Sequence, residues 1–149
     1  MKKIMLSIFL LIFSINIFAD TNAILFVSLG MPKPVLRQYL LQSKQYHIPL
    51  ILRGLIDNQY PTTAKKIFEI LHPKNGAEIK SGFEIDPLYF RQYQINAVPA
   101  LLVFNPNNKN HYTVIYGNIP IQQSLALIAQ KSQLEDIKTV SKNILEKRS

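Results

Sequence analysis

The side chains that could carry chemistry are few and scattered in this chain of 149 residues. It holds no cysteine, so thiol redox catalysis and disulfide bonds are excluded. His47, His72 and His111 lie beside no paired carboxylates and lack the spacing of convergent metal ligands. Ser28 and Ser43 have no supporting His and Asp pair, and the chain has no glycine-rich phosphate loop. We therefore expect no enzyme: no catalytic residue, no cofactor and no metal site.

Arg53 is the strongest candidate for a binding or structural role. Arg53 and Gly54 directly follow an apolar segment at residues 50–52, where a buried and unpaired charge would be costly. We expect an ion pair between Arg53 and Asp57 or Asp86. Two interpretations remain open: a structural ion pair that joins two loops, or an arginine that binds a partner at the carboxyl edge of a sheet.

A second candidate surface lies at Met31 and Pro32. Gly30 and Pro32 interrupt an apolar run, and Pro34 suits the first position of a helix. The free backbone N–H groups at such a helix start carry a partial positive charge. Met31 and Pro32 therefore form either a simple turn or, together with Pro99, a peptide- or anion-binding edge.

Apolar periodicity predicts one α/β domain. The continuous apolar runs at residues 23–27 and 50–52 are typical of strands buried on both faces. A helix from Pro34 between them would make a parallel β-α-β unit. Asp86, followed by proline, is a strong helix start, because its side chain can cap the first turn. Residues 77–84 are interpreted as a loop with a short extended piece.

The remaining elements complete the order β-α-β, helix, short helix, β-β-α. A helix is expected to begin at Thr62 or Thr63, either of which can cap it. Strands at 101–104 and 111–116 should form a hairpin around a loop at 105–110. Further helices are expected at residues 88–93, 121–130 and 133–149, the last of them amphipathic. The predicted order of strands in the sheet is 50–53, 24–28, 101–104 and 111–116.

The Val98-Pro99 step resembles the cis-proline turn of thioredoxin-like folds, in which such a step leads directly into an apolar strand. X-Pro is the linkage at which a cis peptide bond costs least. We expect the Val98-Pro99 bond to be cis, with Pro99 facing the loop 30–33. Together with the order of elements, this implies a thioredoxin-like fold with an extra C-terminal helix and a function other than redox chemistry.

The start of the chain resembles a secretory signal peptide. Lys2 and Lys3 precede an apolar stretch at residues 4–13, which is too short to span a bilayer, and Ala19 supplies a small residue before a cut. An uncleaved anchor is the alternative. We expect a signal peptide, a single domain and a C-terminal helix at residues 1–19, 20–132 and 133–149. No later stretch is apolar enough to suggest a membrane span after cleavage.

The basic charge does not indicate a nucleic-acid partner. The net charge is +8, and it falls to +6 when the two lysines Lys2 and Lys3 leave with the signal peptide. The remaining lysines and arginines are dispersed and form no basic arm. This favours a role in solubility over binding to nucleic acid or to a membrane.

Several short motifs, in one order along the chain, resemble the TrbC-type pilus assembly proteins of F-type conjugative transfer systems. They lie at residues 26–28, 31–32, 52–55, 85–87, 90, 95, 97–100 and 117. The resemblance covers about residues 24–130. It implies a periplasmic, non-enzymatic protein that assembles the conjugative pilus of a type IV secretion system. It also implies protein partners in the conjugation machinery, including a TraW-like protein.

A function of another class remains open. A thiol-independent chaperone for exported polypeptides could use a groove beside Pro99 to hold an extended chain. The sequence predicts no oligomeric state and does not identify the surface that binds a partner.

Overall fold

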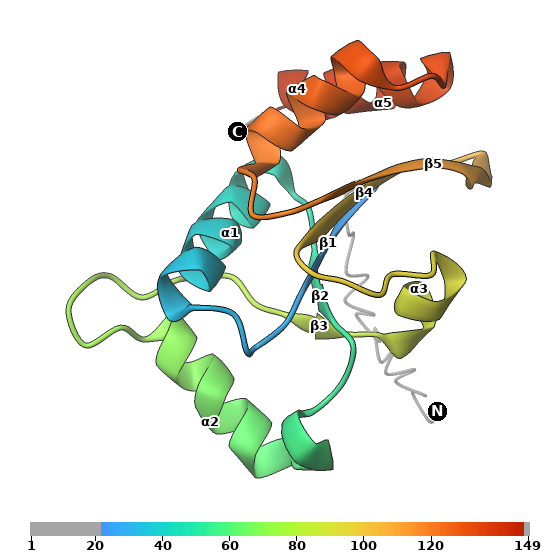
Figure 1. Ribbon diagram of the computed structural model, residues 1–149. Coiled ribbons are helices and arrows are strands. Elements are labelled where there is room, and N and C mark those ends of the chain that lie inside the picture. Colours follow the sequence, from blue (N-terminus) through green and yellow to red (C-terminus); the bar gives the residue numbers. More distant parts are fainter. Residues whose placement is uncertain (1–21, 148–149) are drawn as a thin grey trace, which may run out of the picture.

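A five-stranded mixed sheet lies at the centre of residues 22–147, the part of the chain that the structure describes. The structure is a computed structural model (Figure 1). Its elements are β1 (Ala23–Val27), α1 (Lys33–Tyr46), β2 (Leu50–Leu52), the 3-10 helix η1 (Ile56–Asn58), α2 (Tyr60–Leu71), β3 (Glu84–Ile85), α3 (Pro87–Gln92), β4 (Ala100–Asn105), β5 (Asn108–Tyr116), α4 (Ile121–Lys131) and α5 (Glu135–Glu146). The predicted signal peptide at residues 1–19 lies outside the described residues.

The strands lie in the order β3-β2-β1-β4-β5. β1 pairs in parallel with β2, and β4 pairs antiparallel with both β1 and β5. The predicted order of four strands is therefore confirmed, as is the parallel β-α-β unit. The fold is of the mixed α/β class.

The fifth strand, β3, forms at the end of the segment interpreted as a loop with a short extended piece. Its two residues pair in parallel with Ile51 and Leu52 of β2. The backbone N–H of Asp86 then donates to the carbonyl of Leu52 at 3.0 Å. Two residues carry no periodic pattern, so only the pairing with β2 identifies this strand.

Alternate residues of β1 face two separate cores, which explains its unbroken apolar sequence. Ala23, Leu25 and Val27 pack into a core with residues of α1, α4 and α5. Ile24 and Phe26 pack on the other face, into a core that includes α3. Figure 1 shows α1 and α3 on opposite sides of the strands. The predicted burial of this strand on both faces is confirmed.

Helix α2 begins earlier than predicted. It starts at Tyr60, with Gln59 at the N-cap position and a proline in its first turn. Thr63 is buried inside the helix, where its Oγ1 donates to the Gln59 carbonyl at 2.7 Å and accepts from the Ile56 N–H at 2.9 Å. A helix start at Thr62 or Thr63 is thus wrong, because the fixed φ of proline already suits the first turn.

The hairpin β4–β5 has a much tighter turn than the predicted loop 105–110. Its strands extend to Asn105 and from Asn108, which leaves Pro106 and Asn107 between them. Asn105 Oδ1 accepts a hydrogen bond from the Asn107 N–H at 2.9 Å, and Asn108 Oδ1 accepts one from the Asn110 N–H at 3.2 Å. The contact between Asn105 and Asn107 therefore lies in the turn, whereas the contact between Asn108 and Asn110 lies at the start of β5.

The C-terminal helix forms as α5 and packs against α4. Ile137 is fully buried there, and the Ser141 hydroxyl donates to the carbonyl of Leu125 at 2.8 Å.

Arg37 of α1 joins α1 to the end of α2. It donates to the carbonyls of Glu69 and Ile70, at 3.0 and 2.9 Å, and so closes the last turn of α2. Within residues 22–147, no helix combines the length and the apolar character that crossing a membrane requires.

Candidate functional site

A hollow opens where β1 and β2 end and the loop before β4 passes them. Its volume is about 560 Å³. It is lined by residues 27–30, 52–56, 58, 90 and 96–98. We call it the sheet-end hollow. It gathers three segments that are far apart in the sequence, because the carboxyl ends of the parallel strands β1 and β2 and the start of the antiparallel strand β4 lie at the same edge of the sheet.

Arg53 is the charged side chain on the wall of this hollow. Its Nη2 donates to the carbonyl of Ile95 at 2.6 Å. Its guanidinium carbon lies 4.9 Å from the centroid of the Phe90 ring, which is a cation–π distance. The side chain remains exposed, so water reaches its other N–H groups. Arg53 therefore joins β2 to the loop before β4 and still presents donors to the hollow.

The expected ion pair of Arg53 with Asp57 or Asp86 is wrong. Within residues 22–147 Arg53 has no ion pair, and its hydrogen bond goes to a backbone carbonyl. The expectation assumed a buried charge, which would need a carboxylate. The strand ends at the surface instead, and solvent removes that need.

Asp86 is engaged elsewhere, as the predicted cap of α3. Its Oδ1 accepts hydrogen bonds from the N–H groups of Leu88 and Tyr89, at 2.8 and 3.4 Å. Glu84 lies close to it, and the pKa of Glu84 is raised, mainly by burial and further by the charge of Asp86. This acidic pair belongs to β3 and α3 and does not line the sheet-end hollow.

Gly54 and Asp57 lie on the segment that follows β2. Gly54 lines the hollow, and a Cβ added to it would meet no atom within 4 Å, so space does not demand glycine there. Asp57 is exposed in η1, with a φ of 47°. Aspartate tolerates this left-handed conformation better than most residues. Asp57 thus shapes the turn after β2 rather than the wall of the hollow.

Met31 and Pro32 lie beside the hollow rather than in its wall. Met31 is half-buried against the core that β1 forms with α1, α4 and α5, and Pro32 is the N-cap residue of α1. The turn is closed by Ser28: its Oγ accepts from the Gly30 N–H at 3.1 Å and its carbonyl accepts from the Met31 N–H at 3.1 Å. These contacts favour the interpretation of Met31 and Pro32 as part of a simple turn. Gly30 is the residue of this turn that lines the hollow.

The Val98-Pro99 peptide bond is cis, as predicted. The Pro99 carbonyl accepts a hydrogen bond from the Gly117 N–H at 3.0 Å. Val98, rather than Pro99, lines the sheet-end hollow together with Gly30. The expected contact of Pro99 with the loop 30–33 stays a prediction.

Sequence reasoning missed several residues of the hollow. Phe90, Asn96, Ala97 and Asn58 line it, although none was a candidate. Asn96 and Ala97 directly precede the Val-Pro step, and this position in the sequence could have identified them as candidates. Phe90 is an interior aromatic by type, and only the tertiary structure places it beneath Arg53.

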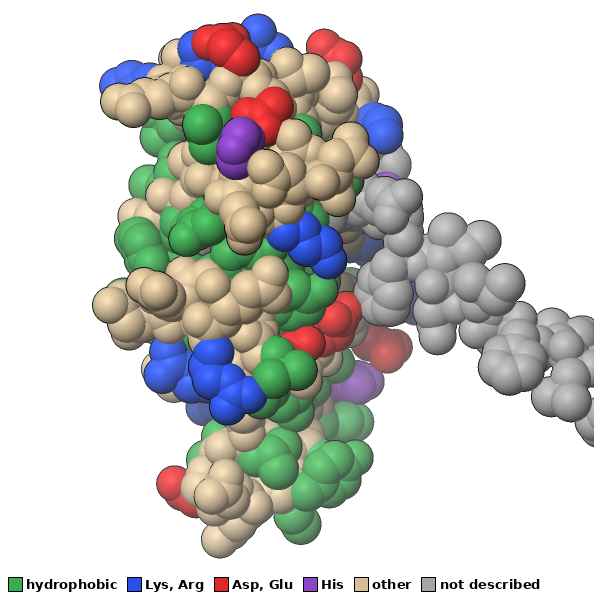
Figure 2. Space-filling model, turned by 90° about the vertical axis from the view of Figure 1, so that its right-hand side faces the viewer, with side chains coloured by type: hydrophobic (Ala, Val, Ile, Leu, Met, Phe, Trp, Pro, Cys, Tyr) green, Lys and Arg blue, Asp and Glu red, His purple; other side chains and the backbone are tan. Residues whose placement is uncertain are grey.

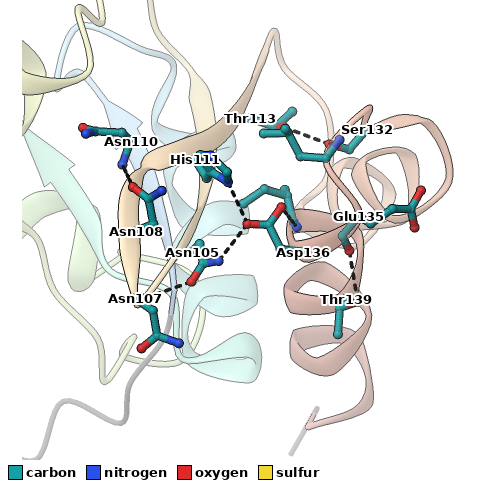
Figure 3. Close-up of polar contacts among 12 residues, drawn as sticks. Asn105, Asn107, Asn108, Asn110, His111, Thr113, Ser132, Glu135, Asp136 and Thr139 are labelled. Carbon is teal, nitrogen blue, oxygen red and sulfur yellow. Dashed lines mark hydrogen bonds and ion pairs between the residues drawn. The ribbon is translucent and has the colours of Figure 1, made fainter.

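A second polar cluster joins the hairpin to α5 (Figure 3). Asp136 Oδ2 accepts from Asn105 Nδ2 at 2.7 Å and lies 3.1 Å from His111 Nδ1. Elsewhere, His72 Nε2 lies 3.2 Å from Glu78 Oε1. His72 and His111 therefore each lie beside a single carboxylate, not beside a pair of them, and for His111 that carboxylate comes from a distant segment of the chain. Among residues 22–147, no group of three or more His, Cys, Asp or Glu side chains is placed to hold a metal ion.

Comparison with known proteins gives matches to a protein family and to a curated protein. The profile of the family described as "Type-F conjugative transfer system pilin assembly protein" matches residues 25–128. The "Periplasmic protein TrbC" of Escherichia coli (strain K12) is 37% identical over 108 residues, which are 72% of this chain and 48% of that protein. The chain therefore spans about half the length of the curated relative it matches. No solved structure matches the chain.

Proposed function

Because this chain belongs to the family of type-F conjugative transfer system pilin assembly proteins, we propose that it is a non-enzymatic assembly factor for the conjugative pilus. The chain is periplasmic, like the relative named for that compartment. Export by a signal peptide at residues 1–19 is part of the proposal. Its partners would be proteins of the conjugation machinery, with a TraW-like protein as the first candidate.

The observation that carries this proposal is the extent of the family match. Residues 25–128 run from β1 into α4 and contain every segment that lines the sheet-end hollow. The family relationship thus covers the candidate site itself and not only a distant part of the chain.

The chemistry of the hollow supports a role without catalysis. Its lining holds one ionisable side chain, Arg53, and in the described chain no carboxylate, imidazole or thiol lies beside it in that wall. General acid–base or nucleophilic catalysis needs such groups within hydrogen-bond reach of a substrate. A guanidinium among backbone, amide, hydroxyl and apolar groups is suited to holding a partner.

We also propose that the fold is thioredoxin-like with an added C-terminal helix. The strand order β3-β2-β1-β4-β5, with a parallel β1–β2 pair and an antiparallel β4–β5 hairpin, supports this. The positions of α1 and α3 on opposite faces of the sheet support it too (Figure 1).

Deletion of the gene in a cell that carries the conjugative element tests the assembly role. Pili counted by electron microscopy and mating frequency should both be lost, and the gene supplied from a plasmid should restore them. Disulfide formation in other periplasmic proteins should be unchanged, since the chain has no cysteine. Normal piliation in the clean deletion would reject the assembly role in favour of a thiol-independent chaperone for exported polypeptides.

A further inference from the structure

A second hollow adjoins the sheet-end hollow on the side of α3. Its volume is about 500 Å³, and it is lined by residues 53, 87, 90, 91 and 94–96. We call it the α3 hollow. The two hollows share Arg53, Phe90 and Asn96. Arg53 and Phe90 therefore stand between two open spaces that follow one another along the edge of the sheet.

The charge of this double hollow has one sign. Among the residues that the structure describes, Arg53 and Arg91 are the two charged side chains in its walls, and both are exposed. Asp57 and Asp86 adjoin lining residues in the chain, but neither they nor Glu84 line the hollows. Figure 2 views the molecule from the side that carries α3, where Lys and Arg side chains lie in several places beside hydrophobic ones, and Asp and Glu side chains lie on the same side. A bound segment would therefore meet positive charge and apolar surface together.

The guanidinium of Arg53 is held in place before any partner binds. The Ile95 carbonyl takes one of its five N–H donors, and the Phe90 ring supports its face. Within residues 22–147 the remaining donors have no partner. Arg91 likewise has no side-chain hydrogen bond or ion pair with the described residues. A fixed guanidinium fork with unused donors suits a carboxylate, because it loses little side-chain entropy on binding.

We propose that the two hollows form one groove that docks an acidic, extended segment of a protein partner. A carboxylate of that segment binds Arg53 at the centre and a second one lies near Arg91 in the α3 hollow, while an apolar side chain on the other side of Arg53 rests against Val98 in the sheet-end hollow. This inference rests on the proposed function, since it describes how an assembly factor would hold its partner.

The test uses the protein isolated from the periplasm and a fluorescein-labelled peptide in which glutamates alternate with serines and leucines. The control peptide has every glutamate replaced by glutamine. Fluorescence anisotropy should show binding of the acidic peptide only, and about 0.5 M salt should weaken it because both arginines are exposed to screening. Arg91→Gln and Arg53→Gln should each weaken binding by about tenfold. Lys142→Gln, which removes an exposed charge from α5, should leave it unchanged.

Circular dichroism of each variant separates lost binding from lost folding. Arg91→Gln is the decisive variant, because Arg91 makes no side-chain bond within the described fold. Equal binding of the glutamine peptide, or unchanged affinity in Arg91→Gln and Arg53→Gln, would overturn the proposal. A third result would also overturn it: the protein binds phosphatidylglycerol vesicles but not the acidic peptide, and Arg91→Gln and Arg53→Gln abolish the binding to vesicles. If the peptide test fails but the deletion strain still lacks pili, the assembly role stands. The partner then binds to a different surface of the protein.

Discussion

Asn105 Nδ2 donates to Oδ2 of Asp136 across 2.7 Å and so fastens the end of β4 to the first turn of α5. His111 Nδ1 lies 3.1 Å from the same oxygen, and the Ile137 N–H donates to Oδ1 at 3.0 Å. The bond from Asn105, followed by those from His111 and Ile137, holds the pKa of Asp136 below its ordinary value against the opposing effect of desolvation. The carboxylate is therefore a link between hairpin and helix that works in its ionised form.

The parent protein should lose stability as the pH falls, and the variants Asp136→Asn and Asn105→Ala should each lose less stability than the parent over the same pH range. The folded pKa of Asp136 lies below the unfolded value of about 3.9, so the ionised group stabilises the fold above that value. This contribution is lost as the pH falls through the folded pKa. Midpoints of urea unfolding, measured between about pH 3 and about pH 6, give the size of this contribution in each protein. Asn107→Ala, on the same hairpin, should keep the normal acid dependence. The same slope in all four proteins would refute the link.

Glu84→Gln should stabilise the protein at neutral pH. Burial, aided by Asp86, raises the pKa of Glu84 in the fold above its unfolded value of about 4.3. The ionised carboxylate therefore costs stability above the folded pKa, whereas below the unfolded value the cost is absent. The urea midpoint of Glu84→Gln should exceed that of the parent at pH 7, and the difference should shrink at about pH 3.5. An equal difference at both pH values would show that ionisation of Glu84 is not the cause.

Asp86→Ala should destabilise the protein by about 1 kcal/mol, because two N–H groups at the start of α3 lose their acceptor. Asp86→Asn removes the same charge but keeps an acceptor, so it is the matched control and should cost less. The free energy of unfolding in urea measures both. If the two variants lose the same stability, the charge rather than the cap is responsible.

Ile137→Ala should cost about 2–5 kcal/mol, because Ile137 is fully buried between α5 and the main core. Lys142→Ala, on the exposed side of the same helix, should stay within about 0.5 kcal/mol of the parent. Urea unfolding of the two variants tests whether α5 is an integral part of the fold. A small effect of Ile137→Ala would mean that the sheet and α1 remain stable without α5.

Local pattern was enough to identify most of the helices and strands. Continuous apolar runs at β1 and β2 predict strands buried on both faces, and the alternation of two cores along β1 is the reason. The cap at Asp86 also follows from residue types that act within one turn. Where the pattern failed, the competing signal was local too: a proline opens α2 ahead of the threonines.

The partners of single side chains depended on the tertiary structure. Residue types predicted a carboxylate for Arg53, but the fold places a carbonyl and an aromatic ring there instead. The two-residue strand β3 exists only because β2 offers it an edge.

The sequence by itself determined that thiol chemistry is excluded, that the fold is α/β, and which family the motifs resemble, because composition, periodicity and short motifs are properties of the chain alone. Only the tertiary structure decided that Arg53, Phe90 and Asn96 share the wall of two hollows, and that Asp136 joins the hairpin to α5. These relationships connect segments far apart in the chain. They follow from strand order and helix packing, which no local pattern encodes.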